Sequence, residues 1–175
     1  MMPSPAHAPA PPSPWVVRWA EYLVPGAAVL DLACGSGRHA RWFGTSGHPV
    51  EAVDRDAGAL AMLDGVANVA TRVADLESGP WPYAGRTFGA VIVTNYLYRP
   101  LFPALLAAVA PGGLLIYETF ARGNERHGRP SNPDFLLEPG ELLERVRGEL
   151  RVLGYEDVEV VEPRPACVQR LCARR

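Results

Sequence analysis

The chain has 175 residues, which is enough for one domain with a sizeable core. With 48% hydrophobic residues, 21% charged residues and a formal net charge of −2, it has an ordinary globular composition and no general electrostatic attraction to nucleic acid. No apolar run approaches the roughly 20 residues of a membrane helix. We therefore expect neither a membrane nor a nucleic-acid partner, and the composition gives no indication of an oligomeric state.

The cysteines bear on the cellular compartment. Cys34, Cys167 and Cys172 are odd in number and form no C-x-x-C motif, and no two of the four histidines have metal-ligand spacing. These patterns favour neither a disulfide framework nor a metal site. They fit a reducing, cytoplasmic location.

The N-terminal residues 1–14 hold six prolines together with alanine and serine. They lack the basic and hydrophobic blocks of a signal peptide, so we predict a polyproline-like or disordered tail outside the fold. The single folded domain is then expected at 15–175. It opens with apolar residues at helical spacing over 15–23, where Val24-Pro25-Gly26 ends the helix.

The rest of the chain alternates between strands and helices. Strands are predicted at 28–33, 50–53, 69–74, 88–94 and 114–119, and helices at 38–46, 57–64, from about 101 to 110, and 138–147. The most apolar of these strands, 88–94, is expected at the centre of a parallel sheet. The last two predicted strands, 150–161 and 166–173, are joined too closely for a parallel crossover, so they should form an antiparallel hairpin.

A turn with two glycines follows the first predicted strand, at Gly35-Ser36-Gly37. Such a turn lets the backbone approach a ligand closely, and with Ala40 it also satisfies the dinucleotide-binding fingerprint. The carboxylate of Asp31, inside the strand, argues against this alternative because it would repel a pyrophosphate. A cationic ligand suits Asp31 better.

Polar residues also end the next three predicted strands. Asp54 follows Gly35 by 19 residues, about where a carboxylate accepts hydrogen bonds from ribose hydroxyls, and Asp75 and Asn95 end the other two strands. Carboxylates in such positions are costly to desolvate unless they are paired. The pattern therefore predicts a polar, nucleoside-like ligand across the carboxyl ends of the strands.

Together these residues resemble the class I S-adenosylmethionine-dependent methyltransferases. The matching segments are 29–37, 52–54, 74–76 and 111–115, and Ala33 stands where many members have glycine. The resemblance covers about 15–174 and is closest to small bacterial members without added domains. It implies an α/β fold, a Rossmann-like three-layer sandwich whose seven-stranded, mostly parallel sheet has the order 3-2-1-4-5-7-6 with strand 7 antiparallel.

The resemblance also implies roles for individual residues around S-adenosyl-L-methionine. Asp31 would face the ammonium group, Asp54 the ribose and Asp75 with Leu76 the adenine. Asn95 and Tyr96 would lie beside the methyl donor, with Tyr96 a catalytic candidate. The full set of expected cofactor contacts is Asp31, Ala33, Cys34, Gly35, Ser36, Gly37, Asp54, Arg55, Asp75, Leu76 and Asn95. Arg38 and His39 are either solvent-facing or cofactor contacts.

The acceptor is expected to be a small molecule held by the long polar loop at 120–137 and by neighbouring groups. The expected contacts are Tyr98, Arg99, Glu118, Arg122, Asn124 and Arg129, with His127 a candidate general base. Arg122, Arg126 and Arg129 would bind an anionic acceptor, or else pair with Glu118, Glu125 and Asp134. The alternatives are an RNA or protein methyltransferase and a non-catalytic cofactor-binding module.

Overall fold

The computed structural model describes residues 10–175, and residues 1–9, with most of the predicted tail, lie outside the described residues. Seven strands form one sheet in the order β3-β2-β1-β4-β5-β7-β6, in which β7 is antiparallel to its neighbours. This confirms the predicted topology, the central place of β4 and the terminal hairpin. The strands are β1 (Val29–Leu32), β2 (Val50–Asp54), β3 (Val69–Val73), β4 (Phe88–Thr94), β5 (Val109–Phe120), β6 (Arg151–Val160) and β7 (Ala166–Arg174).

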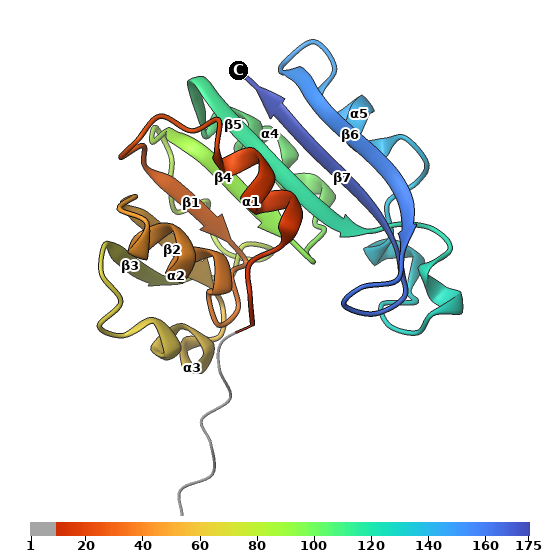
Figure 1. Cartoon of the computed structure of the whole chain (residues 1–175), viewed down its shortest axis with the longest axis horizontal. Coiled ribbons are helices and arrows are strands. Elements are labelled where there is room, and N and C mark those ends of the chain that lie inside the picture. Colours follow the sequence, from red (N-terminus) through yellow and green to blue (C-terminus); the bar gives the residue numbers. More distant parts are fainter. Residues whose placement is uncertain (1–9) are drawn as a thin grey trace, which may run out of the picture.

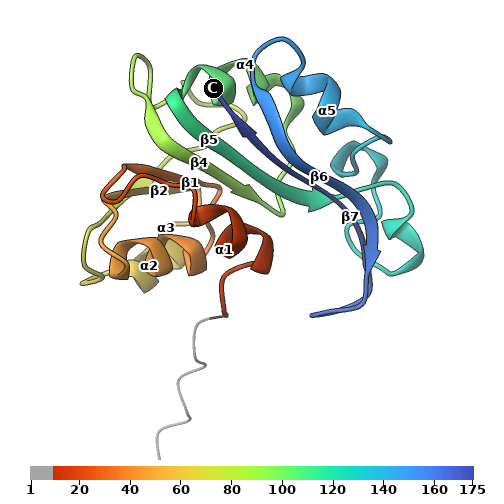
Figure 2. The same cartoon turned by 45° about the horizontal axis from the view of Figure 1, so that its top comes forward.

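Helices cover both faces of the sheet (Figure 1). The α-helices are α1 (Pro14–Ala20), α2 (Arg38–Thr45), α3 (Ala57–Leu60), α4 (Phe102–Ala107) and α5 (Glu141–Val146). In both views α1 and α2 lie on one side and α4 and α5 on the other (Figure 2). Within the part of the chain that the structure describes, no helix has the length and hydropathy of a membrane span.

Successive side chains of the central strands point to opposite faces of the sheet, so there is a hydrophobic core on each face. Leu30 and Leu32 of β1 point into the core that includes Phe102 of α4. Val29 of the same strand belongs to the opposite core, with Phe43 of α2. All four residues of β1 are buried, as expected of a parallel strand covered on both faces. Because Asp31 shares the parity of Val29, its carboxylate is buried on the α2 side.

Several predicted boundaries were wrong. The helix predicted over 138–147 begins only at Glu141, because Gly140 has φ 74° and the Glu138 carbonyl is taken by the Gln169 amide. The fifth strand begins at Val109 rather than 114, because Val109 pairs with Phe88 before a register shift. The helix predicted over 15–23 ends at Ala20.

The N-terminal boundary of the fold also differs from the expectation. Ser13, predicted in the tail, is only 3% exposed, and its side chain accepts the backbone N–H of Trp15 as the N-cap of α1. Pro14 is the first residue of that helix. The folded part therefore includes residues before the predicted start at 15.

Candidate active site

Three cavities meet at the carboxyl edge of the parallel strands, where ligands bind in open α/β sheets. The first, called here the strand-end cavity, has about 400 Å³ and extends from Ala33 past Asp54 and Leu76. The loop cavity, of about 260 Å³, lies between Tyr96 and Pro130. The hairpin cavity, of about 400 Å³, is lined by the segment before α1, the end of β5 and the β6–β7 turn. Asn95 lines all three.

The glycine turn provides backbone that a ligand can approach. Ala33, Gly35 and Gly37 have φ values of 50°, 55° and 73°. Three of the five residues at 33–37 are therefore in the left-handed region. A Cβ at Gly35 would meet nothing within 4 Å among the described residues, whereas one at Gly37 would lie 2.4 Å from a methyl of Leu63. Gly35 thus leaves open space, and Gly37 is required by packing.

Asp31 is the buried carboxylate behind this turn. Its Oδ2 accepts the Ala40 N–H at 2.8 Å, while Oδ1 has no hydrogen-bond partner in the described chain. Burial raises the pKa of Asp31 to about 7, although the Ala40 N–H and Arg38 oppose the rise. A buried carboxylate oxygen without a partner can accept a hydrogen bond from a cationic group.

Asp54 ends β2 at the rim of the strand-end cavity. Its Oδ2 accepts the Gly35 N–H at 2.8 Å and its Oδ1 the Asp56 N–H at 2.9 Å. These bonds hold the glycine turn against β2 and leave each oxygen one further lone pair for a ligand hydroxyl. Arg55, beside it, is exposed and also lines the cavity.

Asp75 is placed at the same cavity, but its carboxylate already caps the next turn. Its Oδ1 accepts the N–H groups of Glu77 and Ser78, and its Oδ2 accepts the Ser78 hydroxyl at 2.6 Å. The Ser78 hydroxyl first, and then the two N–H groups, lower the pKa of Asp75. The neighbouring Leu76 is buried and supplies apolar surface to the cavity wall.

Asn95 and Tyr96 follow β4 at the junction of the cavities. Asn95 is held in the left-handed region, with φ 55°, and its N–H donates to the Glu118 carbonyl at 2.9 Å. Strained conformations of this kind persist where the surroundings enforce them and cluster at functional sites. Burial first, and then Glu77, raise the pKa of Tyr96, so its phenol stays protonated at neutral pH.

Two of the remaining cofactor candidates are half-buried or exposed in the turn. Cys34 is half-buried, and burial first, with Asp31 and Asp54, raises the pKa of its thiol. Ser36 is exposed. Its side chain forms no hydrogen bond within 10–175.

A buried series of polar contacts, which the sequence did not reveal, lies beside the hairpin cavity. Ser13 donates its hydroxyl to Glu118 at 2.8 Å and its N–H to Nε2 of His39 at 3.1 Å. Glu118 also pairs with Arg170, which reaches Glu156 on β6. His39 is therefore buried rather than solvent-facing, and burial, aided by Arg38, lowers its pKa to about 3. The sequence holds no local signal for these contacts.

Several expected acceptor contacts are instead held by protein groups. Arg99 pairs with Glu141 at 2.8 Å and donates to the carbonyls of Asp134 and Leu136. Arg122 pairs with Glu138, and the buried Asn124 bonds the Pro130 carbonyl and the Cys167 N–H. None of these three side chains lines the cavities described above. Their contacts shape the 120–137 loop.

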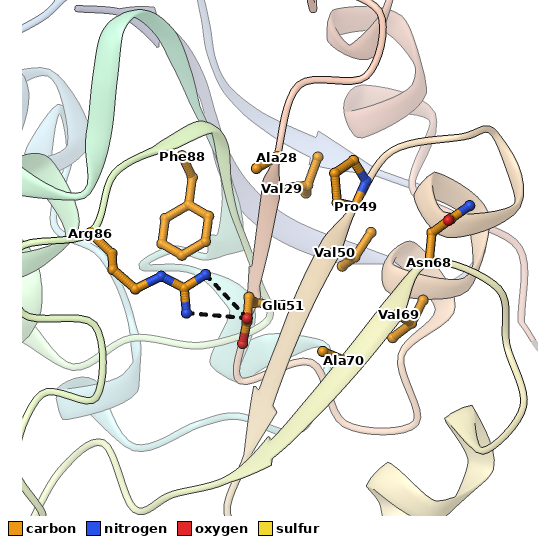
Figure 3. Close-up of a pocket in the computed structure, with 10 residues that line it drawn as sticks. All are labelled: Ala28, Val29, Pro49, Val50, Glu51, Asn68, Val69, Ala70, Arg86 and Phe88. Atoms are coloured by element: carbon orange, nitrogen blue, oxygen red, sulfur yellow. Dashed lines mark hydrogen bonds and ion pairs between the residues drawn. The ribbon is translucent and has the colours of Figure 1, made fainter.

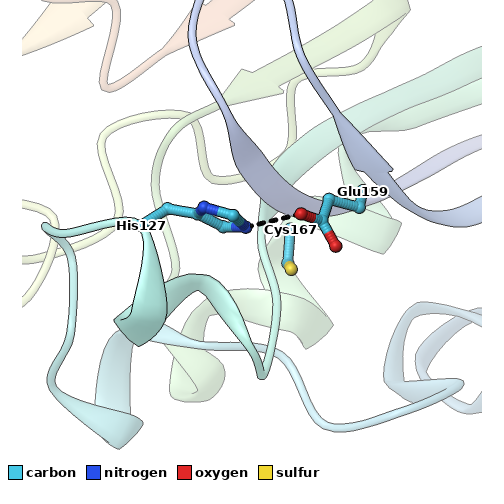
Figure 4. Close-up of side chains that lie close together, drawn as sticks. All are labelled: His127, Glu159 and Cys167. Carbon is cyan, nitrogen blue, oxygen red and sulfur yellow. Dashed lines mark ion pairs between the residues drawn. The ribbon is translucent and has the colours of Figure 1, made fainter.

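The other candidates differ in position. Glu118 lines the hairpin cavity. Tyr98 donates its hydroxyl to the Glu77 carbonyl, and Arg129 is exposed on the loop. His127 lines none of these cavities, and its ring points toward Glu159 on β6 (Figure 4). The structure therefore does not bring His127 to the junction at Asn95.

A fourth cavity, of about 320 Å³, lies at the opposite edge of the sheet, at the amino ends of β1, β2 and β3 (Figure 3). Its walls are mostly strand residues, among them the large side chain of Phe88, and the ion pair of Arg86 with Glu51, at 3.1 Å. It has no glycine turn and no orphaned carboxylate among the residues that line it. This edge is not where such sheets bind their cofactors.

Residues 29–113 match the family model described as a methyltransferase domain. The matched segment is a class I S-adenosylmethionine-dependent methyltransferase domain. The match covers the glycine turn, Asp54, Asp75 and Asn95, and so includes every wall of the strand-end cavity except Phe135. No curated protein sequence matches the methyltransferase significantly.

Solved structures share the fold of this methyltransferase. TehB from Haemophilus influenzae superposes with a TM-score of 0.74 at 20% identity, over 91% of this chain and 61% of that one. An S-adenosylmethionine-dependent methyltransferase from Methanosarcina mazei gives 0.71 at 12%, over 95% and 99%. Coclaurine N-methyltransferase, bound to N-methylheliamine and S-adenosylhomocysteine, gives 0.70 at 11%, over 92% and 71%. The chain thus spans about three fifths of the length of TehB, and at these identities the likeness shows the fold.

The residues present fit the cofactor of this family. The orphaned Oδ1 of Asp31 suits an ammonium group, the open space at Gly35 admits the ligand, and Asp54 has lone pairs for hydroxyls. S-adenosylmethionine supplies a sulfonium methyl group that is already activated for transfer. The chain itself therefore has to orient the acceptor, exclude water and, where the acceptor is protonated, accept a proton.

Proposed function

We propose that this methyltransferase methylates a small-molecule acceptor bound next to the strand-end cavity. The observation that supports this most is the position of Asn95, which lines the strand-end, loop and hairpin cavities together. A donor in the first cavity and an acceptor in either of the others would meet at this residue. The cavities, of about 260 and 400 Å³, are close to the roughly 300–1,000 Å³ of small-molecule sites.

The cofactor roles in this proposal follow the geometry. Asp31 neutralises an ammonium group through Oδ1, Gly35 and Ala33 provide close backbone, and Asp54 accepts from ribose hydroxyls. Leu76 packs against the adenine, and Asp75 contributes mainly through the backbone that its carboxylate fixes.

The acceptor roles are assigned to the hairpin and loop cavities. Phe120 lines both, and apolar Val160 and Val168 line the hairpin cavity with Pro11, Pro12 and the first residue of α1, Pro14. Tyr96, protonated at neutral pH, is suited to donate a hydrogen bond rather than to accept a proton. The hairpin cavity is also lined by charged side chains, namely Arg38, Glu118, Glu162, Arg164 and Arg170. These walls together favour an acceptor that has both an apolar part and a polar group.

Cytoplasmic location is also part of the proposal. Cys34, Cys167 and Cys172 are free thiols in the described chain, as a reducing compartment requires.

Labelled S-adenosylmethionine tests this function. We expect purified enzyme to bind S-adenosylhomocysteine in calorimetry and to transfer label to a small-molecule fraction of a cell extract. Asp54→Asn should weaken cofactor binding at least tenfold, whereas Asp157→Asn, on exposed β6, should leave it unchanged. Label in RNA or protein instead would favour the alternative acceptors, and cofactor binding without transfer would favour a non-catalytic module.

A further inference from the structure

A second group of chemistry-bearing side chains lies away from the cavities, where the 120–137 loop meets the β6–β7 hairpin. His127 of the loop, Glu159 of β6 and Cys167 of β7 offer a nitrogen, an oxygen and a sulfur that all lie within 4.8 Å of one another (Figure 4). The three residues are 32 and 8 positions apart in the chain, so local ligand spacing did not reveal them.

The His127 imidazole lacks a satisfactory partner. Its Nε2 lies 2.9 Å from a carboxylate oxygen of Glu159, yet this nitrogen is buried and makes no well-aligned hydrogen bond to any described residue. Buried ring nitrogens are normally satisfied, and this one is directed at the other two ligand atoms. An ion held by all three side chains would give this nitrogen a partner.

The donor set of nitrogen, oxygen and sulfur favours zinc. Zinc takes thiolate at about 2.3 Å and imidazole or carboxylate at about 2.0–2.2 Å, so the ligand atoms around one ion lie less than about 4 Å apart. The three ligand atoms here lie within 4.8 Å of one another, so small side-chain movements would bring them to that geometry. Hard cations such as Mg²⁺ prefer oxygen ligands only. We propose that His127, Glu159 and Cys167 bind one zinc ion, with water as the fourth ligand.

The backbone already holds Cys167 in place for this role. Its N–H donates to Oδ1 of the buried Asn124 at 3.2 Å, and its carbonyl accepts the Ala121 N–H at 2.9 Å. The sulfur packs against Gly123, where a Cβ would approach it to 3.1 Å. Only His127 and Glu159 have to move, and Glu159 has a side chain that is 48% exposed.

Arg126 is the cation that now neutralises this cluster. Its guanidinium donates to Glu159 at 2.6 Å and contacts the sulfur of Cys167 at 3.5 Å. Its side chain is 60% exposed, and ion pairs of this kind contribute little to stability, so zinc can displace it. Arg126 therefore competes with zinc, while the other three residues bind it.

A bound ion would fasten the 120–137 loop to the β6–β7 hairpin. Both segments border the cavities, since Pro130 lines the loop cavity and Arg164 the hairpin cavity. Zinc would thereby fix the walls of the acceptor region without touching the cofactor residues. The zinc proposal itself does not depend on methyl transfer.

Calorimetric titration of the metal-free full chain with zinc, and cobalt(II) absorption, test the proposal. We expect one zinc per chain, no binding of Mg²⁺, and a thiolate-to-cobalt charge-transfer band. Cys167→Ser and His127→Ala should weaken zinc binding more than about a hundredfold, because even outer partners of metal sites cost about 10–100-fold. His48→Ala, a histidine bonded to the Ala27 carbonyl, is the matched control and should bind as wild type.

Arg126→Gln separates a metal site from a structural ion pair. If Arg126 competes with the ion, its removal should tighten zinc binding roughly two- to fivefold, the scale of a surface ion pair. If these side chains form only an ion-pair cluster, Arg126→Gln should not bind zinc more tightly than the wild type. Absence of zinc binding in the wild type, or binding that survives Cys167→Ser with circular dichroism unchanged, would overturn the proposal.

Discussion

At the scale of single residues, Ala33 is in a conformation that suits glycine. Its φ of 50° lies in the left-handed region, which costs a residue with a Cβ about 1–2 kcal/mol. Asn95 has the same conformation with φ 55°, and both residues line the strand-end cavity. Two strained residues at one cavity support its role as the ligand site.

Ala33→Gly should therefore stabilise the protein. The gain from removing strain exceeds the added entropy of the unfolded chain, and we expect about 0.5–1 kcal/mol, or a melting temperature about 2 °C higher. The control is the same change at Ala40, which is buried within α2, where glycine should cost about 1 kcal/mol or more. A destabilised Ala33→Gly variant would show that the methyl group contributes more by packing than it costs in strain.

The buried carboxylate of Asp31 makes stability depend on pH. Its pKa in the folded state is about 7 and its ordinary value is 3.8, so between these values the folded state binds a proton that the unfolded state lacks. The free energy of unfolding contributed by Asp31 should fall as pH rises from about 4 to 7, by up to about 1.4 kcal/mol per pH unit.

His39 acts in the opposite direction over much of the same range. Its pKa in the folded state is about 3 against an ordinary 6.5, so the unfolded state binds the extra proton and stability from His39 grows as pH rises from about 3 to 6.5. Wild-type stability alone would hide both effects. The readout is the difference in urea unfolding free energy between wild type and Asp31→Asn, which should move in favour of the variant from pH 4 to 7. A difference independent of pH would contradict the raised pKa.

At the scale of elements, the loop at 120–137 is shaped by Arg99. Burial alone would raise the pKa of Glu141, but hydrogen bonds from Arg99, the Glu138 N–H and Arg145 lower it to about 2. The same guanidinium holds two carbonyls of the segment 134–136. Arg99 therefore fixes the loop between β5 and α5.

Arg99→Ala should destabilise the protein by about 2 kcal/mol, because a half-buried carboxylate and two carbonyls lose a charged donor. Arg99→Lys should recover little of this, since an ammonium group lacks the guanidinium fork. Urea denaturation measures both. If stability is unchanged while acceptor affinity falls, Arg99 is a ligand contact, as the sequence analysis expected.

The sequence predicted the elements well where the information is local. The spacing of hydrophobic residues, with the glycines and prolines between segments, located all seven strands. The resemblance to a known family supplied their order in the sheet. Side-chain partners were predicted less well. Arg122 was expected to contact the acceptor or else to pair with Glu118, Glu125 or Asp134, whereas the structure pairs it with Glu138. The partners of Ser13 lie 26 and 105 residues away, and no pattern along the chain records such distances.

At the scale of the whole molecule, a series of polar contacts through Ser13 joins the segment before α1 to α2 and to the sheet. The segment before α1 is bonded to His39 of α2 and to Glu118 of β5, and Glu118 continues through Arg170 of β7 to Glu156 of β6. Three of these residues, Ser13, Glu118 and Arg170, line the hairpin cavity. The packing of the segment before α1 and the shape of the cavity are therefore coupled.

Ser13→Ala tests that coupling. The variant loses the N-cap of α1, worth about 1 kcal/mol, and leaves the buried Oε1 of Glu118 without its donor, so we expect a total loss of about 2–3 kcal/mol. For a chain of this length the melting temperature should fall by about 4–12 °C. Ser36→Ala, at an exposed serine, should change stability by less than about 0.5 kcal/mol. In a double-mutant cycle with Glu118→Gln, a coupling energy near zero would mean that Ser13 acts only as a helix cap, because contacting residues in one network are coupled by about 0.5–3 kcal/mol.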